Sequence, residues 1–158
     1  MQTLSSSLIL RSASAADLSS LLGLEQEVFP PQRQESRRSL ALSLNSASQE
    51  VWVYSTATSD IAAAMTLLLS PQSIRIYSLA VRSVYRGQGL GERLMSHAEQ
   101  RARTLHKSSL RLEADADNPQ LISWYLRQGF LPVTELPDYY GPHTRALRLQ
   151  KRLTAERA

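Results

Sequence analysis

The 158-residue chain contains no cysteine. Disulfide bonds, thiolate nucleophiles and cysteine-based metal sites are therefore excluded. Histidine is almost as scarce, because only His97, His106 and His143 occur, and they are scattered without the spacing of a metal site. We expect all three to be solvated surface side chains, and we expect no metal cofactor.

Long apolar runs are also missing. The longest apolar-rich stretch, Ile61–Leu69, has the length of a strand, whereas a membrane-spanning helix requires about 18 apolar residues. Residues Met1–Ser7 lack the basic start and the apolar block of a secretory signal. We therefore expect a cytoplasmic protein without a membrane partner. The length suits a single compact domain with a hydrophobic core, covering residues 1–158.

Neither sign of charge dominates the sequence. The 18 lysine and arginine residues and the 14 aspartate and glutamate residues give a formal net charge of +4. This balance is compatible with an anionic ligand, a nucleic acid or an acidic partner, and it does not choose among them. The basic residues are spread along the chain rather than packed in one run, which is typical of solvated surface charge. A nucleic-acid partner is therefore disfavoured.

The apolar segments that are present follow a clear order. Short or alternating apolar segments predict strands at residues 8–10, 50–56, 61–69, 73–81, 109–114, 131–136 and 144–150. Apolar positions at helical spacing predict helices at residues 14–30, 36–44, 90–105 and 118–129. Strands and helices thus occur in a mixed order along one chain. This order predicts an α+β (mixed α/β) fold built on one central sheet.

Local signals mark the ends of these helices. Ser14 is a candidate N-cap with Asp17 three residues later, as in a capping box. Asn118 is the candidate N-cap of the last helix, and Gly129 is its candidate C-terminal stop. The first helix is expected to end at Pro30, after five residues at helical spacing, which are Leu18, Leu21, Leu22, Glu25 and Val28.

A glycine cluster between the strand at 73–81 and the helix at 90–105 is the most informative segment. Glycines allow the backbone to approach a ligand closely, and the N-terminus of the following helix attracts phosphate. Arg86 can add a charge-assisted contact. The cluster therefore indicates a phosphate-binding loop, with a plain glycine turn as the alternative. It consists of Arg86, Gly87, Gln88, Gly89, Leu90 and Gly91.

Two other kinds of phosphate-binding loop can be weighed by their context. A Walker A loop is excluded because no Gly-Lys-Ser or Gly-Lys-Thr follows the cluster. A Rossmann loop follows the first strand of a βαβ unit and requires an acidic residue about 20 positions later. Glu113 lies at about that distance, but the cluster follows a predicted meander of strands. A dinucleotide-binding fold is therefore disfavoured.

The strand end and the glycine cluster resemble motif A of the GNAT superfamily of N-acetyltransferases. The resemblance implies that the cluster binds the pyrophosphate of the cosubstrate acetyl-CoA, and that the preceding strand pairs through its backbone with the pantetheine arm. The CoA-binding residues that it implies here are Leu79, Ala80, Val81, Arg86, Gly87, Gln88, Gly89, Leu90 and Gly91.

A second segment strengthens the resemblance. Residues Asn118–Phe130, with Tyr125 seven positions after the asparagine, resemble motif B of the same superfamily. The two motifs occur in the right order, and the resemblance extends from about Leu8 to Leu149. It implies a mostly antiparallel, twisted sheet of about seven strands flanked by about four helices.

Acetylation of an amine requires that the acceptor lose a proton and that the departing thiolate receive one. Glu113, Asn118 and Tyr125 resemble, in identity and spacing, three residues of the ribosomal-protein N-terminal-alanine acetyltransferases. The resemblance implies that Glu113 is the general base, directly or through a water, that Asn118 contacts CoA, and that Tyr125 is the general acid. A surface ion pair is the alternative for Glu113, which shares a strand face with Arg111. A core aromatic is the alternative for Tyr125.

Tyr139 and Tyr140 form the other notable pair. They resemble the paired tyrosines that peptide N-terminal acetyltransferases place over the acceptor backbone, and tyrosine hydroxyls can bind a peptide while the rings form a slot. Two surface tyrosines in a loop from Pro137 to Pro142 are the alternative. The sequence departs from the family at Arg82–Val84 and lacks an aromatic residue after Phe29-Pro30. These departures concern the acceptor rather than CoA.

The leading hypothesis is an acetyltransferase that acts on a protein N-terminal α-amine, as a monomer or a homodimer. The same fold acting on a small amine is the first alternative. Acetylation of aminoacyl-tRNA is the second, and the basic balance permits it. A non-catalytic acyl-CoA-binding regulatory module is an alternative of another class. It is disfavoured because a sensor has no need of an acid and a base.

Overall fold

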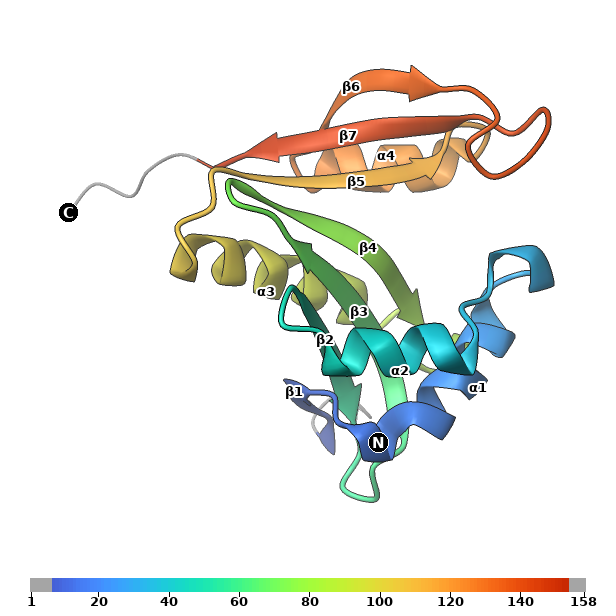
Figure 1. Cartoon of the computed structure of the whole chain (residues 1–158), viewed down its shortest axis with the longest axis vertical. Coiled ribbons are helices and arrows are strands. Elements are labelled where there is room, and N and C mark those ends of the chain that lie inside the picture. Colours follow the sequence, from blue (N-terminus) through green and yellow to red (C-terminus); the bar gives the residue numbers. More distant parts are fainter. Residues whose placement is uncertain (1–6, 154–158) are drawn as a thin grey trace. The chain divides into compact units, whose positions relative to one another are not determined.

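The computed structural model describes residues 7–153, and seven strands and four α-helices lie in this range (Figure 1). The strands are β1 (Ile9–Ser12), β2 (Gln49–Ser55), β3 (Ile61–Leu69), β4 (Ser73–Val81), β5 (Ser109–Asp115), β6 (Leu131–Leu136) and β7 (Ala146–Arg152). The helices are α1 (Leu18–Val28), α2 (Arg37–Asn45), α3 (Leu90–Thr104) and α4 (Pro119–Arg127). Short 3₁₀ turns occur at Ala15–Asp17, Pro31–Arg33 and Ser83–Tyr85.

The strands form one sheet in the order β1-β2-β3-β4-β5-β7-β6. The pairs β1–β2, β2–β3, β5–β7 and β6–β7 are antiparallel, and β4–β5 is parallel. The predicted α+β fold, with a mostly antiparallel seven-stranded sheet and four helices, is thus confirmed. The first and last strands lie one or two residues further along the chain than the sequence predicted.

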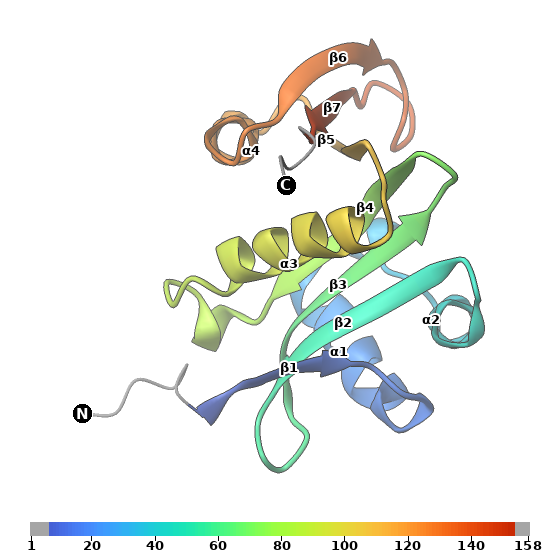
Figure 2. The same ribbon diagram turned by 90° about the vertical axis from the view of Figure 1, so that its left-hand side faces the viewer.

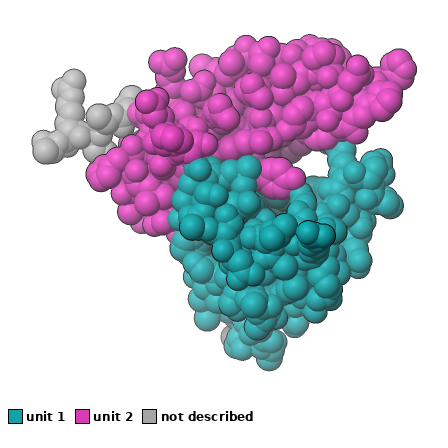
Figure 3. All heavy atoms as spheres, viewed as in Figure 1, with its two compact units in different colours: residues 1–69, 78–94 teal, residues 70–77, 95–158 magenta. Residues whose placement is uncertain are grey.

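The chain divides into two compact units, which Figure 3 shows in different colours. Among the described residues, unit 1 contains 7–69 and 78–94, and unit 2 contains 70–77 and 95–153. The division falls within β4 and within α3. A single domain of residues 1–158 therefore stays a prediction, and each unit is described by itself.

In unit 1, α1 and α2 lie on the same side of β2 and β3 (Figure 2). Leu21 and Leu24 of α1 and Leu40 of α2 are buried against Val53 of β2 and Ala64 of β3. The predicted capping box of Ser14 and Asp17 is present, and α2 begins with a cap that the sequence analysis did not name. The Ser14 N–H donates to the Asp17 carboxylate at 2.8 Å before α1, and the Ser36 hydroxyl caps α2 by accepting from the Ser39 N–H.

In unit 2, β5 lies between β4 and β7, and β7 also pairs with β6. Leu110 and Leu112 of β5 are buried, as are Phe130 and Leu149. The predicted ends of α4 are confirmed. The Asn118 side chain accepts a hydrogen bond from the Leu121 N–H, and Gly129 follows the helix at φ +98°, a left-handed conformation that favours glycine.

Three sequence expectations remain to be compared with the structure. His106 and His143 are exposed as expected, whereas His97 of α3 is half-buried with its Nε2 atom inside the protein. None of the helices between residues 7 and 153 is long and apolar enough to cross a membrane. The expectation for Met1–Ser7 falls outside the described residues, apart from Ser7.

Candidate active site

The glycine cluster forms the turn that leads from β4 into α3 in unit 1. Gly87 has φ +81° and Gly89 has φ +78°, and L side chains rarely adopt this left-handed conformation. A Cβ atom added at Gly87 would meet no heavy atom within 4 Å. The two glycines are therefore required by the path of the backbone, and the space beside Gly87 is open to a ligand.

Polar contacts hold the segment before this turn. Glu27 of α1 accepts hydrogen bonds from the Arg82 side chain at 3.2 Å and from the Ser83 N–H at 3.0 Å. The exposed Arg86 donates from Nε to the Val81 carbonyl at 3.4 Å. The predicted CoA-binding strand residues Leu79, Ala80 and Val81 are the last three of β4.

The start of α3 has the properties of an anion-binding site. The helix has 15 residues, and its first N–H groups and its dipole favour a negative charge. Gln88, within the turn, has a buried Oε1 atom for which the described residues provide no hydrogen-bond donor. The acidic Glu92 lies in the first helical turn, with its Oε2 atom 4.0 Å from the position of a Cβ atom built on Gly89, so this carboxylate has to turn away when a phosphate binds beside Gly89. These residues fit the diphosphate and the amide groups of CoA.

Glu113 of β5, in unit 2, is the predicted base, and its side chain is only 3% exposed. Its Oε2 accepts a hydrogen bond from Arg75 Nε at 3.1 Å, and its Oε1 accepts from Arg148 Nη2 at 3.3 Å. Arg148 lies directly opposite Glu113 on β7. The ion pair weighed from the sequence is thus present, but it is buried and involves two arginines rather than the same-strand Arg111.

The two tyrosines of the β6–β7 connection belong to the same network. The Tyr139 hydroxyl accepts a hydrogen bond from Arg75, and the Tyr140 hydroxyl donates to the Glu113 carbonyl at 3.5 Å. The two rings meet edge to face, with centroids 4.9 Å apart. Unit 2 therefore brings together three residues that the sequence indicated separately. Arg75, which the sequence did not indicate, links the Glu113 carboxylate to the Tyr139 hydroxyl, whereas Tyr140 contacts the Glu113 carbonyl directly.

Tyr125 of α4, the predicted acid, is 9% exposed. Its ring packs edge to face against Phe130 with centroids 6.0 Å apart, as expected of a core aromatic. Burial, with a smaller contribution from Tyr140, raises the pKa of Tyr125 to about 12. The hydroxyl therefore keeps its proton throughout the neutral pH range.

Asn118 has a structural contact in the described residues. Its Oδ1 accepts from the Leu121 N–H at 3.1 Å and so caps α4. The side chain is exposed, and the capping bond leaves its N–H donors for a ligand. A contact with CoA stays a prediction.

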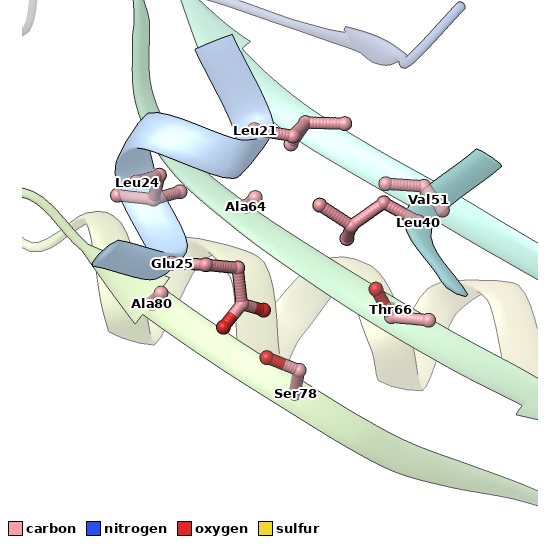
Figure 4. Close-up of a pocket in the computed structure, with 9 residues that line it drawn as sticks. All are labelled: Leu21, Leu24, Glu25, Leu40, Val51, Ala64, Thr66, Ser78 and Ala80. Carbon is pink, nitrogen blue, oxygen red and sulfur yellow. The ribbon is translucent and has the colours of Figure 1, made fainter. Parts of the chain in front are cut away.

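A second buried carboxyl group was not singled out from the sequence. Glu25 of α1, in unit 1, is 7% exposed and lines a small cavity (Figure 4). Burial raises the pKa of Glu25 to about 7; a hydrogen bond from the Glu35 N–H opposes this shift and the charge of Glu35 adds to it. A glutamate within the apolar face of a predicted helix is the signal that could have found it.

The glycine turn before α3 makes this a protein that can bind an anion, such as a diphosphate, at a helix N-terminus. Residues 18–130, more than half of the chain, match the Acetyltransferase (GNAT) family. The chain belongs to this family. The match confirms the superfamily and the class of enzyme that the sequence predicted, an N-acetyltransferase.

One curated relative and two solved structures illustrate the similarity. The "Uncharacterized N-acetyltransferase YesJ" of Bacillus subtilis is 34% identical over 86 residues, which are 54% of this chain and 44% of that protein. The match thus spans less than half the length of this relative.

The solved structures share the fold across nearly the whole chain. The ribosomal-protein alanine N-acetyltransferase of Escherichia coli superposes with a TM-score of 0.80 at 21% identity, covering 95% of this chain and 96% of that chain. A spermidine/spermine N-acetyltransferase of Vibrio cholerae gives 0.75 at 17% identity, covering 95% of both chains. At these identities the likeness shows the fold alone.

Proposed function

We propose that this protein transfers the acetyl group of acetyl-CoA to a primary amine, and that the acceptor is a protein N-terminal α-amine. Acetyl-CoA supplies the thioester whose acyl group is transferred. The observation that carries the proposal is the turn with Gly87 and Gly89 at positive φ directly before α3, open on the side of Gly87. Such a turn presents backbone N–H groups to a diphosphate.

The proposed CoA contacts are those that the resemblance to the family implies. In unit 1, the turn from Arg86 to Gly91 binds the pyrophosphate, and Leu79–Val81 pair through the backbone with the pantetheine arm. In unit 2, Asn118 donates from its side-chain amide to CoA. The open space at Gly87, the exposed guanidinium of Arg86 and the unused N–H donors of Asn118 support these roles.

Tyr125 is the proposed general acid. Its raised pKa keeps the hydroxyl protonated, so that it can donate a hydrogen bond to the departing sulfur. A thiol has an ordinary pKa of about 8.5, so full transfer of the tyrosine proton is uphill unless the hydroxyl is reprotonated at the same time. The proton that the acylated nitrogen must lose can supply this replacement.

Glu113 is proposed as the general base that the resemblance implies. An orienting role for its carboxylate is the alternative. Arg75 and Arg148 engage both carboxylate oxygens, so a proton must use the lone pairs that these contacts leave. The second role is to orient Arg75, which in turn donates to the Tyr139 hydroxyl. A base role predicts a change in the pH profile of Glu113→Gln, whereas an orienting role predicts a change in acceptor affinity.

The acceptor proposal depends on Tyr139 and Tyr140. Their edge-to-face rings and the fixed hydroxyl of Tyr139 provide a polar aromatic wall that suits an extended peptide backbone. The Escherichia coli structural neighbour is by name an acetyltransferase of a ribosomal-protein alanine, which supports the same class of acceptor.

The test measures CoA release with peptides of varied N-terminal residue, polyamines, free amino acids and aminoacyl-tRNA. Peptides are expected to react fastest. If polyamines or aminoacyl-tRNA react far faster than every peptide, the proposed peptide acceptor is wrong. The proposed acetyl transfer from acetyl-CoA to an amine would still hold. No release with any acceptor, together with no thermal stabilisation by saturating acetyl-CoA, would contradict the whole proposal.

Gly89→Val tests the assignment of the CoA loop, because a branched side chain would occupy the approach of the phosphates. We expect the variant to lose most of the thermal shift that acetyl-CoA gives to the wild type. Gly129→Ala is the matched control, since it places a side chain at another positive φ, +98°. The control should be less stable than the wild type and yet keep the shift.

A further inference from the structure

One face of the sheet in unit 2 carries more positive than negative charge. Arg75 of β4 lies directly opposite Arg111 of β5. Arg148 of β7 lies directly opposite Glu113 of β5. Arg111 and Glu113 are two positions apart on β5, so the four side chains stand on the same face of the sheet. This group, which we call the arginine face, therefore sets three guanidinium groups against one carboxylate.

The single carboxylate of the arginine face is shared by two of its arginines. Its Oε2 accepts from Arg75 and its Oε1 accepts from Arg148. Arg111 has no ion-pair partner between residues 7 and 153, and its buried Nε atom finds no hydrogen-bond acceptor there. A buried donor without an acceptor and two like charges in opposition both cost free energy. An anion bound at Arg111 would remove both costs.

A neutral donor lies on the other side of Arg111. Gln150 of β7 is directly opposite Arg111 and is only partly exposed. Neighbouring strands are about 4.8 Å apart, so the long side chains of Arg75, Arg111 and Gln150 can meet at one small anion. A guanidinium fork and an amide N–H group both suit the oxygens of a carboxylate. The arrangement therefore fits a compact anionic group.

Arg75 connects the arginine face to the proposed acceptor wall within the same unit. It donates a hydrogen bond to the hydroxyl of Tyr139, whose side chain is 40% exposed. A peptide whose backbone lies on Tyr139 therefore lies beside Arg75, and the side chain of one of its first residues can extend to Arg111. The chemistry of this side chain should complement the positive charge that it meets.

We propose that Arg111, with Arg75 and Gln150, binds the carboxylate of an aspartate or glutamate near the N-terminus of the acceptor. This inference rests on the proposed function and narrows its acceptor class to acidic peptides. The excess of positive charge repels a polyamine.

A polyanion such as tRNA fits the arginine face less well than a single carboxylate. The side chains of Arg75 and Arg148 are only 26% and 34% exposed, whereas binding to a phosphate backbone relies on accessible basic groups. The exposed Asp138, next to Tyr139, would also repel a chain of phosphates. One carboxylate that enters between the arginines avoids both obstacles.

The test compares kcat/KM for three peptides with the full chain and saturating acetyl-CoA. The peptides begin with Ala-Glu-Glu, Ala-Gln-Gln or Ala-Lys-Lys and are otherwise identical. The acidic peptide should exceed the neutral one by about 10–100-fold, mainly through a lower KM, because hydrogen bonds to charged groups contribute this much. The basic peptide should be the poorest. The advantage of the acidic peptide should shrink as sodium chloride is added.

Variants assign this preference to Arg111. Arg111→Gln should reduce the advantage of the acidic peptide to about twofold or less. Arg111→Lys keeps the charge without the planar fork and should keep part of the advantage. Arg127→Gln is the matched control, because it removes an exposed arginine of α4 in the same unit, and it should keep the whole advantage. The three peptides on the wild type answer the question even if Arg111→Gln does not fold.

The possible results separate this inference from the proposed function. Equal kcat/KM values for the three peptides, or a preference for the basic one, would overturn the acidic preference while acetyl transfer to peptides would still hold. An acidic preference that Arg111→Gln retains in full would overturn the role of Arg111. Aminoacyl-tRNA as the fastest acceptor would overturn the assignment of the arginine face to peptides. A wild-type protein that acetylates no amine would overturn the proposed function, and this inference with it.

Discussion

Each unit contains one glutamate with a buried side chain, and the surroundings of the two side chains are opposite. Glu25 in unit 1 faces an apolar cavity, and the charge nearest to it is that of another glutamate. Glu113 in unit 2 lies between Arg75 and Arg148, with a guanidinium on each carboxylate oxygen. Both side chains are almost inaccessible to solvent. The two glutamate side chains are therefore similarly buried, and they differ in the groups that contact their carboxyl oxygens.

The comparison shows that burial alone does not assign an acid–base role. Burial without a cation raises the pKa of Glu25 into the neutral range, whereas the carboxylate of Glu113 holds two guanidinium groups in place through hydrogen bonds. Within unit 2, Tyr125 is the proposed proton donor, and the Glu113 carboxylate contacts Arg75 and Arg148. The base role that the resemblance implies for Glu113 stays a prediction, and the two glutamates can be tested against each other.

The largest effect should come from the proton donor of unit 2. Tyr125→Phe keeps the ring that packs against Phe130 and removes the hydroxyl. We expect it to fold and to bind acetyl-CoA, yet to lose about 10²–10⁴-fold in kcat, the usual contribution of a positioned acid. Steady-state kinetics with both substrates saturating measures this loss.

Tyr54→Phe is the matched control in unit 1, because Tyr54 of β2 is also buried. Its kcat should stay within about twofold of the wild type, since no proton-transfer role is assigned to it. If Tyr125→Phe also kept its kcat, unit 2 would lack the proposed donor, and positioning of the two substrates would have to account for the rate.

The two glutamates should respond to the same substitution with opposite changes in stability. Glu113→Gln leaves two partly exposed arginines without their anion and should lower the free energy of unfolding by about 2–4 kcal/mol. Glu25→Gln removes a charge that burial disfavours and should raise it by about 1–3 kcal/mol above pH 8, since one pKa unit corresponds to about 1.4 kcal/mol. Chemical denaturation of both variants measures the two signs. Two changes of the same sign would contradict the comparison.

The fold could be read from the sequence mainly where the signals are local. The bounds of β3, β4 and β6 agree with the predicted strands because short turns and alternation mark them. The cap at Asn118 depends on a side chain three residues from the bonded N–H, and the stop at Gly129 depends on a positive φ. Such features need no knowledge of the rest of the chain.

The contacts of the candidate site could not be read in this way. Arg75 is 38 residues from Glu113 and Arg148 is 35 residues from it, so their meeting requires the parallel β4–β5 pairing and the β5–β7 register. Glu25 appears in the sequence as one position of an amphipathic helix. Its isolation from cations is decided by the strands and by α2, which pack over it.

Unit 1 alone also allows a comparison of a paired and an unpaired buried carboxyl group. Asp17 is as buried as Glu25 but accepts two hydrogen bonds from Arg11 at 2.8 Å. The Arg11 guanidinium holds the pKa of Asp17 below its ordinary value of 3.8. Its stabilisation is therefore present above that value and is lost as the pH falls through the folded-state pKa. Glu25 has the opposite slope, because its raised pKa lowers stability as the pH rises from about 4.5 to about 7.

Asp17→Asn should accordingly cost about 1–2 kcal/mol at neutral pH and should flatten the loss of stability in acid. Glu25→Gln should remove the decline between weakly acidic and neutral pH and leave the acid limb in place. Denaturation at a series of pH values measures both slopes. An Asp17→Asn protein with the wild-type acid limb would show that the Arg11 contact does not set the behaviour of Asp17.

The smallest effect should come from Tyr139, whose hydroxyl is linked to the Glu113 carboxylate through Arg75. Tyr139→Phe removes the hydroxyl that Arg75 contacts and keeps a ring that is already 40% exposed. A single hydrogen bond contributes about 0.5–1.5 kcal/mol, so KM for the peptide should rise by about 2–10-fold with little change in kcat. Tyr77→Phe is the control, because the Arg75 guanidinium lies 5.7 Å from the Tyr77 ring centroid and needs only the ring. Equal KM values for Tyr139→Phe and the wild type would show that the Tyr139 hydroxyl does not contribute to peptide binding. The orienting role of Glu113 would then be limited to Arg75 and Arg148.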